Sequence, residues 1–104
     1  MYDVRLLRAY YAGMGFEWPD WALAHLAGVE PQEVRQVLGA IRRWPRLADD
    51  SNVTVLSIWA RTVDGRPLIV VTRQTDQWTW LIVGAREMRA DELTVFEHWE
   101  QENR

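Results

Sequence analysis

The second half of the chain most constrains the fold, because three strand-like segments follow one another and lead directly into a helical segment. The three segments are VTVLSIWART (53–62), RPLIVVTR (66–73) and WTWLIVGAR (78–86). They are rich in β-branched and aromatic residues, as is typical of strands. Asp64 and Gly65 lie between the first two segments and suit a two-residue type I′ turn, which needs positive φ at both residues. The pattern therefore predicts an antiparallel three-strand meander.

This turn sets the predicted register of the first hairpin, and the register assigns each side chain to one face of the sheet. Val63 is expected opposite Arg66, and Trp59 opposite Val70. One face then becomes an apolar core face that carries Leu56, Ile58, Ala60, Ile69 and Val71. The other face is predicted to gather Trp59, Arg61, Trp78, Trp80 and Arg86. Arg73 has the opposite parity and is expected off this second face.

The segments that flank the meander are mostly helical in pattern. After it, Asp91–Gln101 places apolar residues at helical spacing. Before it, residues 3–12, 21–27 and 31–41 have helical patterns, and the last of these begins with a proline that suits a first turn. We therefore predict an α+β fold in which N-terminal helices and a C-terminal helix pack on an antiparallel sheet.

Two short segments complete the prediction. The sequence GFEW at 15–18 precedes a proline and is expected to form a short first strand at a sheet edge. The sequence LADDSN at 47–52 is expected to be a turn-rich linker. The chain is predicted to be one domain, with residues 1–15 as a helical extension, 16–99 as the core and 100–104 as a tail.

Composition limits the class of protein. With 104 residues, 48% of them hydrophobic, and seven tryptophans, the chain can bury a core and is not of the disordered class. It contains no apolar run near the roughly 18 residues of a membrane helix, and its N-terminus lacks a signal-peptide pattern. Because cysteine is absent, disulfides and thiolate metal sites are excluded. We expect a cytoplasmic protein that binds neither membrane nor metal.

The charge distribution allows two interpretations. The formal net charge of −3 argues against a wholly electrostatic nucleic-acid binder. All twelve basic residues are nevertheless arginine, which suits either a GC-rich coding bias or planar, bidentate recognition of phosphate. Residues 53–86 hold four arginines against two acids, whereas residues 87–104 hold two arginines against six acids. The predicted sheet is therefore mildly basic and the closing segment acidic.

Several motifs carry a family likeness. They are FEW at Phe16–Trp18, GVEPQEVRQVL at Gly28–Leu38, ARTVDGRPLIVV at Ala60–Val71, and LIVGAREM at Leu81–Met88 followed by Glu92. In this order, over roughly residues 16–99, they resemble the BrnT-type toxins of bacterial toxin–antitoxin modules, small relatives of the RelE ribonuclease fold. Three positions depart from that pattern: Leu26-Ala27 replaces a Lys-His pair, Phe96 a common tyrosine, and Arg89 a threonine cap.

The resemblance implies a toxin that cleaves mRNA without metal or cofactor. It also implies a cognate antitoxin, a DNA-binding protein of ribbon-helix-helix character, as partner. Arg61 and Arg66 match the arginines that flank the hairpin turn, Arg86 matches the arginine of the AR pair, and Glu92 matches the acidic residue of the closing helix.

These matches lead to a set of expected roles. Arg61, Arg86 and Glu92 are the expected catalytic residues, because metal-independent cleavage needs cations on the phosphorane and proton transfer. Arg66 is expected to hold phosphate, while Trp59 and Trp80 are expected to stack on unpaired bases. The general base is left open among the candidates Glu87, Glu92, His25 and His98.

Each residue also has a plainer interpretation. Arginines at strand ends deter edge-to-edge aggregation, and tryptophans often belong to a core or an interface. The alternative function is therefore a non-catalytic protein-interaction module that uses the Trp-rich sheet face of the same fold. A small-ligand cup lined by tryptophans is a third hypothesis, and homodimerisation stays open.

Overall fold

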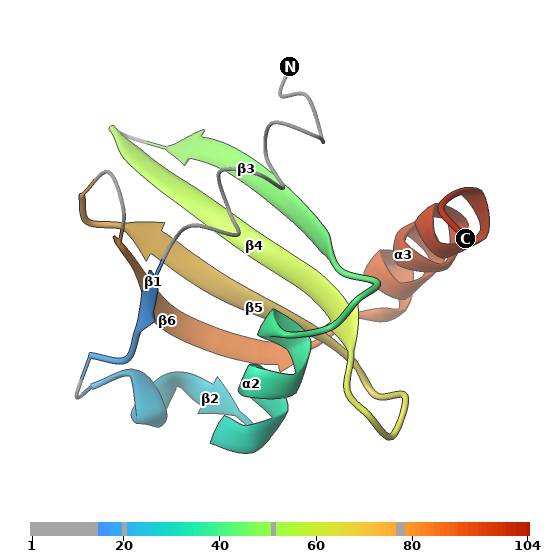
Figure 1. The fold of residues 1–104 in the computed structure, drawn as a ribbon, viewed down its shortest axis with the longest axis horizontal. Coiled ribbons are helices and arrows are strands. Elements are labelled where there is room, and N and C mark those ends of the chain that lie inside the picture. Colours follow the sequence, from blue (N-terminus) through green and yellow to red (C-terminus); the bar gives the residue numbers. More distant parts are fainter. Residues whose placement is uncertain (1–14, 20, 51, 77–78) are drawn as a thin grey trace.

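The protein has an α+β fold built around one mixed sheet, as seen in a computed structural model that describes residues 15–19, 21–50, 52–76 and 79–104 (Figure 1). Its strands are β1 (Gly15–Glu17), β2 (Leu26–Ala27), β3 (Trp44–Asp50), β4 (Val53–Arg61), β5 (Pro67–Gln74) and β6 (Thr79–Glu87). Its helices are the 3-10 helix η1 (Ala22–His25), α2 (Pro31–Leu38) and α3 (Ala90–Glu102). The predicted α+β class, the first short strand, the meander and the closing helix are confirmed.

The sheet has the strand order β1-β6-β5-β4-β3, and strands β3 to β6 are antiparallel neighbours. Both β1 and β2 run parallel to β6 along its outer edge, β1 beside Thr79–Leu81 and β2 beside Ala85-Arg86. The prediction of a purely antiparallel sheet is therefore wrong. Parallel pairing arises because the chain returns to the same edge of β6 after η1 without reversing direction.

Three predicted elements differ from the observed ones. The segment expected to be a linker forms most of β3, because antiparallel pairing with β4 overrides the low strand propensity of its acidic residues. The helix expected over 21–27 is only one 3-10 turn followed by β2. Helix α2 stops at Leu38 rather than residue 41, and the amide of the following residue, Gly39, donates to the Arg35 carbonyl at 3.0 Å. The helix predicted for residues 3–12 lies outside the described residues.

The loop between β4 and β5 contains three residues, not two. The Thr62 amide donates to the Arg66 carbonyl at 2.9 Å, and the Gly65 amide donates to the Thr62 carbonyl at 2.9 Å. Gly65 has a φ of 88°, whereas Asp64 is not among the residues with positive φ. This is the type I turn followed by a left-handed residue that three-residue hairpin loops favour. Trp59 therefore lies opposite Ile69 rather than Val70.

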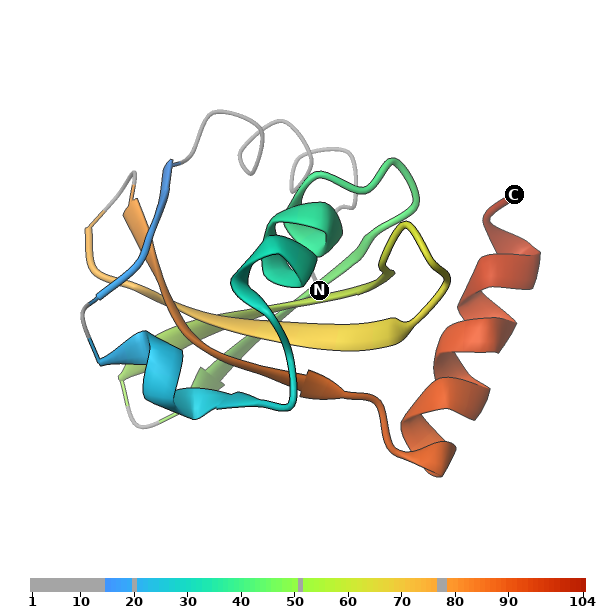
Figure 2. The same ribbon diagram turned by 90° about the horizontal axis from the view of Figure 1, so that it is seen from below.

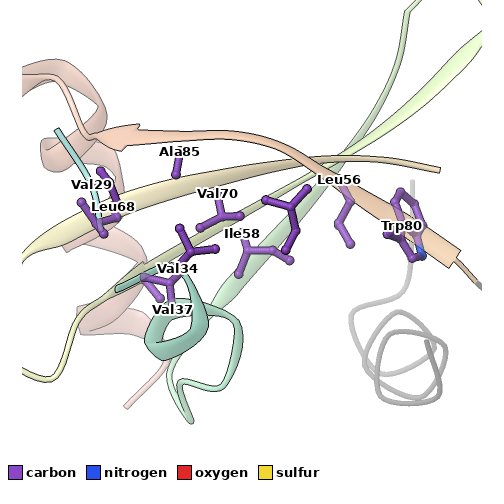
Figure 3. Close-up of a cluster of buried hydrophobic side chains, with 11 residues drawn as sticks. Val29, Val34, Val37, Leu56, Ile58, Leu68, Val70, Trp80 and Ala85 are labelled. Atoms are coloured by element: carbon purple, nitrogen blue, oxygen red, sulfur yellow. The ribbon is translucent and has the colours of Figure 1, made fainter. Parts of the chain in front are cut away.

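A register shift of one residue transfers every β5 side chain to the other face. The residues expected on the core face of β4 are there, but Leu68 and Val70 join them in place of Ile69 and Val71. On β6, Trp80 is only 1% exposed and belongs to this same core (Figure 3). Its predicted place beside Trp59 is wrong, and Trp78 lies outside the described residues.

Helix α2 covers this core face of the sheet (Figures 1 and 3). Pro31 occupies its first turn, and the Glu33 carboxylate accepts a hydrogen bond from the Glu30 amide at 3.0 Å. Val34 and Val37 are completely buried against the sheet. The spacing of apolar residues thus determines which side of α2 faces the strands.

Helix α3 stands at one end of the opposite face, and no other α-helix of the described residues lies on that face (Figure 2). A second apolar cluster joins it to the sheet and contains Trp59, Ile69, Met88 and Phe96. Within the described residues, no helix has the length and apolar character that crossing a membrane requires.

We expect Gly65→Ala to lower the free energy of unfolding by about 1 kcal/mol, since an L side chain is strained at positive φ. No described atom lies within 4 Å of an added Cβ at Gly65, so backbone strain alone causes the loss. Gly65→Asn is the matched control, because asparagine tolerates this conformation better. Urea unfolding measures both variants, and equal stability of Gly65→Ala and the wild type would contradict the assigned turn.

Candidate functional site

The face of the sheet that carries α3 is organised in three rows, because residues opposite each other on neighbouring strands share a face. Row one, nearest α3, consists of Trp44, Trp59, Ile69 and Arg86. Row two consists of Arg46, Ser57, Val71 and Gly84. Row three consists of Ala48, Val55, Arg73, Leu81 and Glu17. We call rows two and three the open face.

Row one is covered by α3, whereas among the described residues the open face meets only the edge of the second apolar cluster at Val71 and the His25 backbone at Gly84. Leu93, Phe96 and Trp99 of α3 pack on the tryptophans and Ile69 of row one. On the open face, Ser57, Val55 and Leu81 are only half-buried. Arg46, Arg73 and Glu17 are exposed. This combination of half-buried apolar residues and exposed charges contrasts with the fully buried α2 side.

A bidentate ion pair holds the start of α3. Arg86 Nη1 and Nη2 donate to the two carboxylate oxygens of Glu92 at 2.6 and 2.8 Å. The Arg89 amide also donates to Glu92, at 2.8 Å, and so Glu92 satisfies the first turn of the helix. The hydrogen bonds from Arg86, followed by the one from Arg89, lower the pKa of Glu92 to about 2. Glu92 is therefore a weak proton acceptor in this arrangement.

A second bidentate pair holds the end of α3. Arg61 Nε and Nη2 donate to the Glu100 carboxylate at 3.0 and 2.9 Å, and Nη1 donates to the Gly65 carbonyl at 3.1 Å. The Arg61 guanidinium also lies 5.7 Å from the Phe96 ring centroid. Its hydrogen bonds to Glu100 raise the pKa of Arg61, so this side chain stays a cation. Two arginines of the sheet thus anchor both ends of one helix.

Arg66 connects three elements at the other side of the hairpin. Its guanidinium donates to Glu33 of α2, Glu87 of β6 and the Gly28 carbonyl, each at 2.9 Å. The Glu30 amide and then Arg66 lower the pKa of Glu33 by hydrogen bonding. Arg66 therefore binds α2 to the sheet, away from the open face.

The structure brings together part of the predicted site. Arg61, Arg86 and Trp59 share the α3 side of the sheet, as predicted, and Glu92 joins them through Arg86. Trp80 is in the core on the opposite face, where its ring meets no solvent, and Arg66 is bound to α2. The catalytic and RNA-binding roles of all six residues stay predictions.

The open face contains two arginines that the sequence analysis did not select. Arg46 and Arg73 make no ion pair with any carboxylate in the described part of the chain. The expected parity of Arg73 is wrong, because the three-residue hairpin loop turns it to this face. Arg46 lies between the predicted helix at 31–41 and the predicted linker at 47–52, where no strand is predicted, but the structure places it in β3. The spacing of Trp44 and Arg46, two residues apart, is the sequence signal for a strand that carries both side chains on one face.

Of the general-base candidates His25, His98 and Glu87, His25 is the one that borders the open face. An added Cβ at Gly84 would lie 3.3 Å from the His25 carbonyl oxygen, so η1 and His25 border the open face. The exposed His25 ring meets Trp21 edge-on at 5.6 Å. His98 pairs with Glu102 on α3 at 3.4 Å, and Glu87 pairs with Arg66. His25 is therefore the candidate that borders the open face.

No three metal-binding side chains of the His, Cys, Asp and Glu types come together within the described ranges. Comparison of the chain with protein-family models and with curated proteins gives no match.

We expect Glu92→Gln to flatten the acid dependence of stability. A carboxylate whose pKa is lowered in the folded state stabilises it above the ordinary pKa of 4.5, and this contribution disappears as the pH falls toward about 2. The difference in unfolding free energy between the wild type and Glu92→Gln should therefore shrink over that interval. Urea unfolding at a series of pH values measures it. Glu97→Gln, from the same helix, is the control, and a constant difference across the interval would contradict the ion pair.

Proposed function

We propose that this protein binds single-stranded RNA on the open face. The observation that carries the proposal is the contrast between two sets of arginines. Arg61, Arg66 and Arg86 are each engaged by glutamates, whereas Arg46 and Arg73 present guanidinium groups on one face without a carboxylate partner among the described residues. Guanidinium groups on a half-apolar sheet surface suit an unpaired strand, whose phosphates and bases both need contacts.

The net charge of the molecule is consistent with RNA binding that depends on only two arginines. With a net charge of −3, the protein has no field that attracts nucleic acid from all sides. Binding then depends on the two local arginines of the open face. For single strands, each neutralised phosphate contributes about −0.7 to the slope of log affinity against log salt, so the expected slope is only about −1.4.

The resemblance to BrnT-type toxins extends the proposal to metal-independent cleavage of the bound RNA, and to neutralisation by a cognate antitoxin. A short first strand, a meander and a closing helix support the finer assignment to the RelE/BrnT arrangement. In this proposal the 2′-hydroxyl attacks the adjacent phosphorus, and His25 at the border of the open face takes its proton. The bond from phosphorus to the 5′-oxygen breaks, which leaves a 2′,3′-cyclic phosphate, and the departing 5′-oxygen takes a proton from water. Arg61 and Arg86 donate to Glu100 and Glu92, so these hydrogen bonds would have to break before the two arginines could stabilise the phosphorane.

Binding is tested with a fluorescently labelled single-stranded RNA and anisotropy measured over a range of salt. We expect Arg73→Ala to weaken binding about 10-fold, as the loss of one charge-assisted hydrogen bond implies. Arg35→Ala, an exposed arginine of α2 and therefore on the other side of the sheet, is the matched control and should bind like the wild type. A wild-type protein that binds no RNA at about 50 mM salt would remove the proposed function.

Cleavage is tested separately, by expression in bacteria and by incubation of purified protein with RNA in the presence of a chelator. We expect growth arrest and RNA fragments from the wild type, and neither from His25→Gln or Arg86→Ala. Circular dichroism checks that each variant is folded, since Arg86 also anchors α3. Harmless expression together with intact RNA would remove the cleavage part and leave the binding part standing.

One observation favours the alternative function, a protein-interaction module. A mainly apolar groove of about 440 Å³ lies between β3 and α3, lined by Trp44, Thr94, Val95, His98, Trp99 and Glu102. Val95 is 47% exposed there. If an antitoxin binds in this groove, Val95→Asp should abolish its co-purification with the protein while RNA binding is unchanged. Retained co-purification would place the partner elsewhere.

A further inference from the structure

A column of stacked planar groups leads from α3 to the open face. Phe96 stacks on Trp99 with ring centroids 5.6 Å apart, and Trp99 stacks on Trp44 at 5.6 Å with an interplanar angle of 7°. The guanidinium carbon of Arg46 lies 4.5 Å from the centroid of the Trp44 ring. These separations are those of offset stacking and of cation–π contact. Arg46 is therefore the outermost layer of the column.

A second tryptophan holds Arg46 from another side. The Arg46 guanidinium carbon is 5.0 Å from the Trp59 ring centroid, and Trp59 meets Trp44 edge-on at 5.5 Å. The Trp59 ring is itself fixed, because its Nε1–H donates to Ser57 Oγ at 3.0 Å. Two indole rings thus restrict a side chain that is otherwise flexible. Restriction before binding lowers the entropy lost when a ligand binds.

The outer side of Arg46 is free to meet a ligand. The side chain is exposed, and no described carboxylate forms an ion pair with it. A guanidinium group offers N–H donors along its edge and a planar face above and below. The edge matches phosphate oxygens, and the planar face accepts a stacked nucleobase.

We propose that Arg46, held by Trp44 and Trp59, is a nucleotide subsite in which an unpaired base continues the column and the adjoining phosphate accepts hydrogen bonds from the guanidinium edge. The proposal rests on the proposed binding of single-stranded RNA and names one site for it. It differs from a simple anion site, which would use only the guanidinium edge and its charge.

The test compares three variants on two ligands. Arg46→Ala removes both contacts, Arg46→Lys retains the charge but has no planar group, and Arg35→Ala is the control for the loss of a surface arginine. The ligands are a labelled single-stranded RNA and an abasic strand of the same length, which has the phosphates without the bases. Anisotropy measures the affinities, and the thermal midpoint confirms that each variant is folded.

We expect Arg46→Ala and Arg46→Lys both to lose roughly 10-fold or more in affinity for RNA, as the loss of one base-stacking contact implies. Arg35→Ala should bind like the wild type, and the wild type should prefer RNA to the abasic strand. In NMR spectra of the wild type, the Trp59 indole N–H signal should shift on addition of RNA.

The contrary outcomes separate the two proposals. If Arg46→Lys binds like the wild type and the abasic strand binds as well as RNA, the site recognises charge alone and the subsite is overturned. If Arg46→Ala retains full RNA affinity while Arg73→Ala loses it, the subsite is overturned and RNA binding on the open face stands. If the wild type binds no RNA, both are overturned.

Discussion

The closure of the β4–β5 hairpin by Thr62 and Arg66 determines which side chains share a face of the sheet. Those two residues bracket a three-residue loop, and the amide of Thr62 donates to the carbonyl of Arg66. This register places Leu68 and Val70 against α2, and it turns Arg73 to the side of Trp59. With a two-residue loop, Leu68 and Val70 would face the side of Trp59, and Arg73 would face the apolar core on the α2 side of the sheet. The open face takes its observed form from this turn together with the β-bulge between Val71 and Thr72, which brings Leu81 opposite Arg73 and leaves Trp80 in the core.

The arginines of the sheet divide according to whether a glutamate reaches them. Arg61 and Arg86 hold the two ends of α3, and Arg66 holds the first turn of α2. Their guanidinium groups are about a third exposed, so each pair contributes modestly to stability and mainly orients its helix. Arg46 is positioned instead by aromatic rings, and no carboxylate of the described residues forms an ion pair with it. The proposed binding on the open face would therefore use different arginines from those that attach the helices.

Helix α3 connects row one with the open face. Its Phe96 and Trp99 belong to the apolar cluster over row one, and Trp99 continues through Trp44 to Arg46. A change in the position of α3 would therefore reach Arg46 through stacked rings. The glutamates of α3 also occupy the donors of Arg61 and Arg86, which phosphate would otherwise need. The proposed cleavage of RNA would therefore require Glu92 and Glu100 to release these arginines, whereas the proposed binding would not.

Local patterns in the sequence determined the three strands of the meander, the first short strand and the closing helix, because each depends on the spacing of apolar residues along one segment. Those patterns also placed Trp59, Arg61 and Arg86 on a common face, since alternation gives each strand an apolar side and the apolar sides of neighbouring strands meet in one core. They failed for β3, whose strand state depends on pairing with β4, and for the hairpin, where Asp64-Gly65 is compatible with two loop lengths. Only the tertiary structure decided the register, the burial of Trp80, the glutamate partners of the arginines and the free position of Arg46. Each of these depends on contacts between segments distant in the chain, which local periodicity does not encode.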